Sequence, residues 1–417
     1  MGFALTGCFI AALALATATR LWLAQRQIRH VRANRNTVPA NFASVIPLSA
    51  HQNAADYAIA KTRLGVVDLL IGVAALIALT LGGGLQFLSG ALAEVFDFSG
   101  LWHGVCLIVA VALFFSLLEL PLSVWRTFVI EARFGFNRQT PLLFMADVAR
   151  QAFIGAALGV PLVILMLWLM ARMGEYWWFY VWLAWMAFNL LVLLLYPTFI
   201  APLFNKFTPL ADPALAGRID ALLARCGYRA GGLFVMDGSK RSSHGNAYFT
   251  GFGAAKRIVF FDTLLARLAP AEVEAILAHE LGHFKRRHVW KRVAWLSAFS
   301  LALLFVLGQL ADRAWFYAGL GVSTPSTAAA LLLFFLVIPV FTFPLQPLAS
   351  LYSRRHEFEA DAYAAMHAGA ADLVRALVRL YQDNAATLTP DPLYSAFYDS
   401  HPPAAMRIAR LQEMPSP

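Results

Sequence analysis

Seven apolar segments, each long enough to cross a bilayer, constrain the fold of this 417-residue chain more than any other feature. About 20 consecutive apolar residues span the hydrocarbon core as a helix. Sixty per cent of the residues are apolar and 14 per cent are charged, whereas soluble proteins have about 25 per cent charged residues. We therefore predict a mainly α integral membrane protein with seven transmembrane helices, near residues 3–24, 65–90, 101–125, 152–171, 177–200, 292–311 and 327–350.

Positive charge alternates between the segments that connect these helices. Segments 25–64, 126–151 and 201–291 are rich in Lys and Arg, whereas 91–100, 172–176 and 312–326 are poor in them. Cytoplasmic loops of membrane proteins carry the excess of Lys and Arg. We therefore expect the N-terminus outside, and the segment 201–291 and the C-terminus in the cytoplasm. This bias also accounts for the net charge of +9. Because no nucleic-acid recognition motif accompanies the charge, we expect the lipid bilayer and no nucleic acid as a partner.

The pentapeptide HELGH at residues 279–283 lies in a segment with helical periodicity that begins near Pro270. On a helix, His279 and His283 are four residues apart and share one face, where two imidazoles can bind one zinc ion. Glu280 is then placed to take a proton from a water molecule that the metal activates. The motif therefore predicts a catalytic metal site.

A second acidic cluster, EFEAD at residues 357–361, follows the last apolar segment. A catalytic zinc site has three protein ligands and one open position, so Glu357 is the predicted third ligand. Asp361 shares the same helical face and is placed to accept the free N–H of a ligand histidine. Glu359 points elsewhere at this spacing. Because two membrane crossings separate His283 from Glu357, both motifs are expected on the same face of the membrane.

These parts predict peptide hydrolysis. Zinc polarises the scissile carbonyl and lowers the pKa of water towards about 7, and Glu280 carries a proton to the leaving amine. The metal itself, or a donor such as His401, would stabilise the oxyanion. A transporter or channel with a structural zinc is the alternative from another class. It does not require a base at position 280, and the sequence has no paired repeats with broken helices.

Five sequence blocks resemble, in the same order, those of the integral-membrane zinc metalloproteases of the type 1 CAAX prenyl protease family. They are GSKRSSHGNAYFTGF at 238–252, KRIVFFDTLL at 256–265, HELGH at 279–283, SRRHEFEAD at 353–361 and YDSHPPAAMRIARL at 398–411. The resemblance implies seven helices that enclose a water-filled chamber, with a small α+β gluzincin-type protease domain. It also implies one Zn²⁺ per chain, held by His279, His283 and Glu357, with Glu280 as the base.

The resemblance implies further roles. Asn246 and Tyr248 match a strand that binds the substrate backbone, and His401 and Arg407 match positions near the reacting carbonyl. Asp361 matches a residue sometimes assigned as a proton donor, so its role as an orienting or a proton-donating group stays open. The expected partner is a peptide or protein substrate, which in this family carries a C-terminal lipid.

Short outward loops, and a C-terminal sequence without a retention signal, favour a bacterial inner membrane over the endoplasmic reticulum. There, cleavage of membrane or misfolded proteins, without prenyl specificity, is the alternative function. We expect four parts: spans 1–5 in 1–200, the protease domain in 201–291, spans 6 and 7 in 292–350, and the rest of the protease domain in 351–417.

The sequence also makes local predictions for short strands and for two polar side chains. Leu233–Met236 is predicted as a strand, and residues 246–252 and 257–261 as a hairpin. Glu119 lies inside the third apolar segment, where a carboxylate faces a cavity or a partner. His288 is expected to be a solvated or capping residue.

Overall fold

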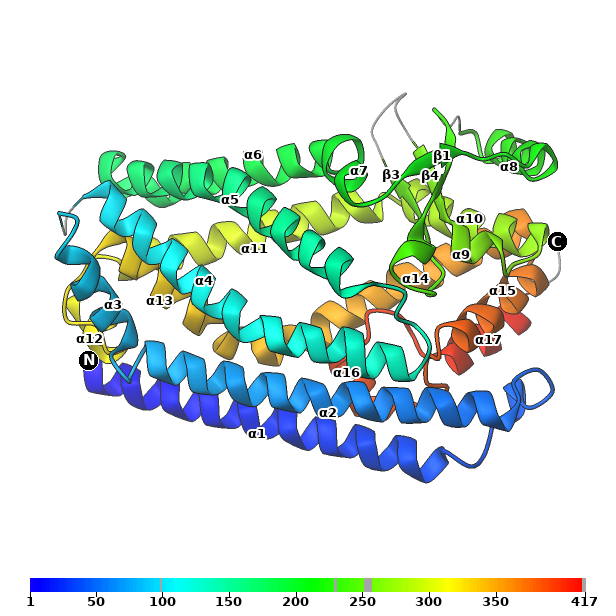
Figure 1. Ribbon diagram of the computed structural model, residues 1–417, viewed down its shortest axis with the longest axis horizontal. Coiled ribbons are helices and arrows are strands. Elements are labelled where there is room, and N and C mark those ends of the chain that lie inside the picture. Colours follow the sequence, from blue (N-terminus) through cyan, green and yellow to red (C-terminus); the bar gives the residue numbers. More distant parts are fainter. Residues whose placement is uncertain (98–99, 229–230, 251–256, 415–417) are drawn as a thin grey trace.

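The computed structural model describes residues 1–97, 100–228, 231–250 and 257–414. Within these residues, seven helices are long and apolar enough to cross a membrane, which confirms the predicted architecture. They run along the long axis of the molecule (Figure 1). They are α1 (Gly2–Asn34), α2 (Leu48–Leu79), α4 (Leu101–Trp125) with its π-helical continuation η2 (Arg126–Glu131), α5 (Pro141–Arg172), α6 (Trp177–Leu195), α11 (His288–Leu310) and α13 (Thr327–Thr342).

The predicted bounds of the second span are wrong at both ends. The span was expected over 65–90, but α2 begins at Leu48 and ends at Leu79. It starts early because its first turns pack on α1, where Val31, Ala55 and Ile59 are buried together. It ends before a turn in which Gly83 has a φ of 74°, a left-handed conformation that glycine adopts without strain. Beyond the turn, α3 (Gly84–Ala93) is a separate short helix.

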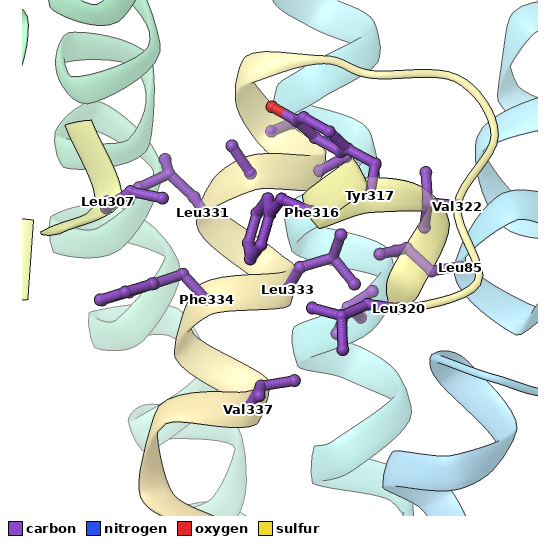
Figure 2. Packing of buried hydrophobic residues seen from close by; sticks show 14 of the residues in the cluster. Leu85, Leu307, Phe316, Tyr317, Leu320, Val322, Leu331, Leu333, Phe334 and Val337 are labelled. Atoms are coloured by element: carbon purple, nitrogen blue, oxygen red, sulfur yellow. The ribbon is translucent and has the colours of Figure 1, made fainter. Parts of the chain in front are cut away.

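The membrane core is densest around α13, which is apolar on all sides. Figure 2 shows Leu331 of α13 between Leu307 of α11 and Phe316 of α12 (Ala314–Gly319). Helix α12 lies near the N-terminus of the chain (Figure 1). Helix α4 also approaches closely, since a Cβ atom on Gly104 would lie 3.2 Å from the Cβ of Ala328. This packing fixes α13, and α13 continues towards the other end of the molecule.

Glu119, which was expected to face a cavity or a partner, lies in the last two turns of α4. Its carboxylate lies 3.6 Å from Arg126, the first residue of the π-helical continuation η2, and both side chains are about half exposed. Glu119 therefore pairs with an arginine that lies seven residues further along the chain. Its side chain does not belong to the buried core of the bundle.

A small four-stranded sheet lies at the end of the molecule opposite α3 and α12 (Figure 1). Its strand order is β1-β2-β4-β3; β2 and β4 are parallel, and the outer pairs are antiparallel. The strands are β1 (Phe207–Pro209), β2 (Leu233–Met236), β3 (Ala247–Thr250) and β4 (Arg257–Phe261). The predicted strand at 233–236 and the two predicted hairpin strands are confirmed, although the connection at 251–256 lies outside the described residues.

Helices from two distant parts of the chain share the core beside this sheet. Leu277 and Leu281 of one part are buried together with Leu377 and Leu411 of the other. The C-terminal segment therefore completes a core that residues 207–285 begin. The helices of this end are α7 (Ala201–Phe204), α8 (Pro213–Arg225), α9 (Asp262–Leu265), α10 (Pro270–Lys285), α15 (Ala370–Asp383) and α17 (Ala404–Gln412). Helix α16 (Pro392–Tyr398) lies nearer the middle of the molecule (Figure 1), where Tyr394 and Phe397 pack against the membrane core.

The last candidate membrane span does not end with α13. After α13, a single 3₁₀ turn at Phe343–Leu345 contains Pro344, and α14 (Gln346–Ala368) then continues in a nearly direct line. Helix α14 lies against α10, so the helix that leaves the membrane reaches the sheet end of the molecule.

Candidate metal centre

Helix α10 presents the HELGH sequence because its start is well defined and its opposite face is apolar. Pro270 occupies the first turn, and Glu272 accepts a hydrogen bond from the backbone N–H of Ala269 at 2.8 Å. Both features stabilise a helix N-terminus. Leu277 and Leu281 turn into the shared core. The histidine-bearing face is thereby directed towards α14.

Gly282 allows the two helices to approach almost backbone to backbone. A Cβ atom at this position would lie 2.9 Å from the Cα of Ala360 and 3.0 Å from the Cβ of Tyr363. Real Cβ atoms do not tolerate such distances from backbone atoms. The glycine between the histidines therefore determines how close α14 comes to α10, and Glu357 lies one turn before the contact.

The side chains of His279, His283 and Glu357 converge at this crossing. The two Nε2 atoms are 3.2 Å apart, and the Glu357 oxygens lie 3.5 Å from His279 and 3.3 Å from His283. Ligands of a tetrahedral zinc ion with bonds of about 2.0–2.1 Å stand about 3.3 Å from one another. The spacing of the three donors therefore fits a shared metal ion.

Glu357 itself gives a second test of this fit. Its Oε2 atom is buried and accepts no hydrogen bond from the described residues. Buried carboxylate oxygens normally have a donor or a metal partner, because an unsatisfied one is costly. Two imidazole nitrogens, one of His279 and one of His401, lie 3.5 Å away without the geometry of a hydrogen bond. The donor set is thus incomplete without a cation.

Asp361 contacts His279 at Nδ1, the ring nitrogen that faces away from His283. Its Oδ1 lies 2.9 Å from Nδ1 of His279, as the Glu-x-x-x-Asp spacing predicts. Asp361 also accepts two hydrogen bonds from Arg407, at 2.8 and 2.6 Å. Burial alone would lower the pKa of His279, but Asp361 and Glu357 together raise this pKa to about 9. The surroundings of the His279 imidazole therefore favour a positive charge, and a metal ion would replace the proton.

Glu280 lies next to the first histidine on α10. Burial raises the pKa of its carboxyl group above the ordinary value, and the imidazoles of His279 and His283 oppose this rise. A base whose pKa moves towards neutrality is better matched to proton transfer near pH 7.

His401 and Arg407 come from the C-terminal segment and differ in exposure. His401 lies before α17, and its side chain is 61% exposed with Nε2 3.5 Å from Glu357. The Arg407 side chain is only 6% exposed, with Nη1 3.9 Å from Glu357. His401 can therefore contact a bound molecule, whereas the guanidinium of Arg407 is held by Asp361.

Asn246 and Tyr248 flank the start of β3, the edge strand of the described sheet. Strand β3 lies against α10. The Asn246 side chain is exposed, with its Oδ1 accepting from the N–H of Ala247 at 2.8 Å, and Tyr248 is half-buried. The structure therefore brings this strand beside the histidine helix, but among the described residues neither side chain hydrogen-bonds to the three candidate metal ligands.

Two residues beside His283 were not predicted to take part. His288 was expected to be solvated or capping, but it is only 4% exposed, and its Nδ1 lies 2.9 Å from Nδ1 of His283. Its other nitrogen lies 3.1 Å from Glu359. The expectation for His288 is therefore wrong. Glu359 points away from the metal, as predicted, and does so towards His288.

A cavity of about 840 Å³ opens beside His401. Its wall includes Lys61 of α2, Glu131 and His244. The phenol of Tyr57 donates to Glu131 at 2.5 Å, and Nε2 of His244 lies 3.4 Å from the same carboxylate. The membrane helices and the sheet end of the molecule thus form one wall next to the candidate metal centre.

Comparisons with known proteins agree with this arrangement. Residues 27–206 match the CAAX prenyl protease N-terminal family with five membrane helices, and residues 209–415 match peptidase family M48. A CAAX prenyl protease 1 homologue of Arabidopsis thaliana is 38% identical over 313 residues, covering 73% of this chain and 72% of that protein. The Homo sapiens homologue is 30% identical over 442 residues, covering 94% and 93%.

The fold comparison covers nearly the whole molecule. The crystal structure of S. mikatae Ste24p superposes with a TM-score of 0.88 and 28% sequence identity, covering 98% of each chain. Sequence and fold therefore agree over both the membrane helices and the sheet end. The chain belongs to the CAAX prenyl protease 1 group of peptidase family M48, and it is an integral membrane metallopeptidase.

Proposed function

We propose that this protein is an endopeptidase that binds one Zn²⁺ per chain through His279, His283 and Glu357. The observation that carries the proposal is the convergence of these ligand atoms within 4.8 Å of one another, with one buried carboxylate oxygen lacking a donor. Two imidazoles and one carboxylate, with a fourth position open, are the donor set of catalytic zinc. A transporter with a structural zinc would not need the base Glu280, so peptide hydrolysis is the better-supported function.

The bound zinc would supply Lewis-acid polarisation of the scissile carbonyl and of the attacking water. Glu280 takes the proton of that water and transfers it to the leaving amine. Asp361 lies 2.9 Å from Nδ1 of His279 and would hold the proton of the ring on that side, which leaves Nε2 free for the metal. Because Asp361 is buried between His279 and Arg407, an orienting role is better supported for it than proton donation.

The exposed imidazole of His401 is a donor for the oxyanion that develops on the carbonyl oxygen. The substrate main chain would add to the free edge of β3, as extended peptides do at exposed sheet edges. Asn246 accepts from Phe261 of β4, and hydrogen bonding alternates along a strand. The carbonyl of Ala247 and the backbone groups of Phe249 therefore face a substrate, whereas the N–H of Ala247 donates to Asn246 Oδ1. Asn246 and Tyr248 would lie beside the bound chain.

The relatives are named as prenyl proteases that act on CAAX sequences, and a C-terminally lipidated peptide is accordingly the first substrate class to test. Cleavage of membrane or misfolded proteins is the alternative within the same chemistry. The basic loops support a cytoplasmic active site with the N-terminus outside. The short outward loops support a bacterial inner membrane. The shared core of residues 207–285 and 370–411 supports two membrane parts alternating with two halves of one protease domain.

The decisive experiment compares purified wild type with Glu280→Gln and His283→Ala in zinc analysis and peptide cleavage. We expect one zinc per chain in wild type and Glu280→Gln, with cleavage lost in Glu280→Gln. His283→Ala should lose the metal. Equal cleavage by wild type and Glu280→Gln would remove Glu280 from its role, and wild-type protein that binds no zinc would overturn the proposal.

A further inference from the structure

His283 has a neighbour at each of its ring nitrogens. Nε2 faces the metal site, 3.2 Å from Nε2 of His279, and Nδ1 lies 2.9 Å from Nδ1 of His288. In a neutral imidazole, one nitrogen carries the proton and the other accepts. Since Nε2 must be unprotonated to bind a metal, the proton belongs on Nδ1. His283 therefore donates to His288.

This assignment fixes the proton of the second imidazole as well. Nδ1 of His288 accepts, so its proton is on Nε2, which lies 3.1 Å from Oε2 of Glu359. Arg355 donates to the other oxygen of Glu359 at 3.2 Å. The ring of His288 is buried and stacks on His356 with centroids 4.0 Å apart. Because the His288 ring is buried, water has little access to its hydrogen-bonding positions. The stacking on His356 holds the plane of the ring.

A break in the helix creates the contact. On an uninterrupted α-helix, side chains five residues apart point about 140° away from each other. Arg287 adopts a left-handed conformation, with φ 56° and ψ 35°, and α11 then begins in a new direction at His288. Non-glycine residues rarely adopt this conformation, and residues held in such strained conformations cluster at functional sites. The strained residue is what turns His288 back onto His283.

We propose that His288 and Glu359 are positioning residues for the metal ligand His283. His288 fixes the tautomer and orientation of the ligand ring, and the Glu359 carboxylate raises its basicity through the intervening imidazole. Each candidate ligand histidine is thus connected to a carboxylate. His279 contacts Asp361 directly, whereas His283 is connected to Glu359 through the imidazole of His288. This inference rests on the proposed zinc site.

The test measures zinc binding to the full-length protein, together with the visible spectrum of the Co²⁺-substituted form. His288→Phe keeps the size and stacking of the ring but removes both hydrogen bonds. We expect its zinc affinity, from competition with a chelator, to fall about 10–100-fold, with an altered cobalt spectrum. His288→Asn restores an acceptor close to the position of Nδ1 and should recover part of the loss.

Two further variants separate the carboxylate from its surroundings. Glu359→Gln keeps an acceptor for His288 but removes the charge, and we expect weaker zinc binding than in wild type. Arg355→Gln is the matched control, because this side chain is 78% exposed, and its zinc affinity should stay within about twofold of wild type. Unlike a general loss of stability, a loss of orientation changes the cobalt spectrum at equal melting temperature.

The outcomes distinguish this inference from the proposed function. If wild type binds zinc and both His288→Asn and His288→Phe match it in affinity and cobalt spectrum, His288 does not position the ligand. Should His288→Phe fail to fold, a wild-type affinity and spectrum in both His288→Asn and Glu359→Gln would equally overturn the inference. Wild-type protein without zinc would instead overturn the proposed function, on which this one depends.

Discussion

The burial of Arg407 distinguishes between two possible roles, direct contact with the substrate and pairing with Asp361. The family resemblance places it near the reacting carbonyl. In the structure it is 5% exposed and donates twice to Asp361, which is 1% exposed. A charge buried this deeply is stable only when its partner is present. The residue is therefore expected to act through Asp361.

Arg407→Met should leave the Asp361 carboxylate buried without its main partner. Removing one member of a buried ion pair costs about 3–5 kcal/mol, so we expect a large drop in the thermal stability of the purified protein. Arg407→Met combined with Asp361→Asn should recover part of the loss in a double-mutant comparison. If Arg407→Met were as stable as wild type and changed only the KM for peptides, Arg407 would be a substrate-binding residue.

At the scale of elements, the crossing of α10 and α14 depends on Gly282. Gly282→Ala would insert a methyl group against the backbone of Ala360, which cannot move aside as a flexible side chain would. We expect a loss of about 1–3 kcal/mol in the free energy of unfolding, together with weaker zinc binding because the helices separate.

Gly217→Ala on α8 is the matched control for this substitution. No atom lies within 4 Å of a Cβ at Gly217, and the position is an exposed helix interior. Alanine there should stabilise the protein by about 0.5–1 kcal/mol. If Gly282→Ala behaved like Gly217→Ala, the close approach of the two helices would not matter for the site.

The sequence predicts contacts between residues of the same helix better than contacts that depend on a break between two helices. The pairs His279–His283 and Glu357–Asp361 lie within single helices, so their spacing alone predicts which side chains share a face. The role of His288 could not be predicted in this way. It depends on a left-handed Arg287, and helix ends of this kind are usually marked by glycine. A basic residue at that point looks like a continuing helix.

At the scale of the whole molecule, hydropathy predicts that both motifs lie on one face of the membrane. Helices α11 and α13 separate His283 from Glu357, and two crossings return the chain to its starting side. Span bounds were less predictable, because the polar first half of α2 belongs to the same helix as its apolar half. The chamber stays a prediction, and the described residues line cavities of about 910 Å³ and 840 Å³ at opposite ends of the molecule.

The orientation can be tested by labelling single cysteines in intact cells with a reagent that does not cross the bilayer. In a background without Cys8, Cys106 and Cys226, Ser323→Cys should react from outside, whereas Ala221→Cys should react only after the cells are opened. Both positions are exposed. The native Cys226 is buried and cannot report on either side. Labelling of Ala221→Cys in sealed cells would reverse the proposed orientation.

The placement of the third candidate ligand on α14 has a consequence for biosynthesis. A ribosome completes the HELGH helix before it has made α11, α13 or α14, and Glu357 reaches the histidines only when those two spans have been threaded through the bilayer. If Glu357 is the third ligand, we expect the nascent chain to have no proteolytic activity until insertion is finished. A half-inserted molecule, or a fragment that ends before α14, would lack the proposed third ligand.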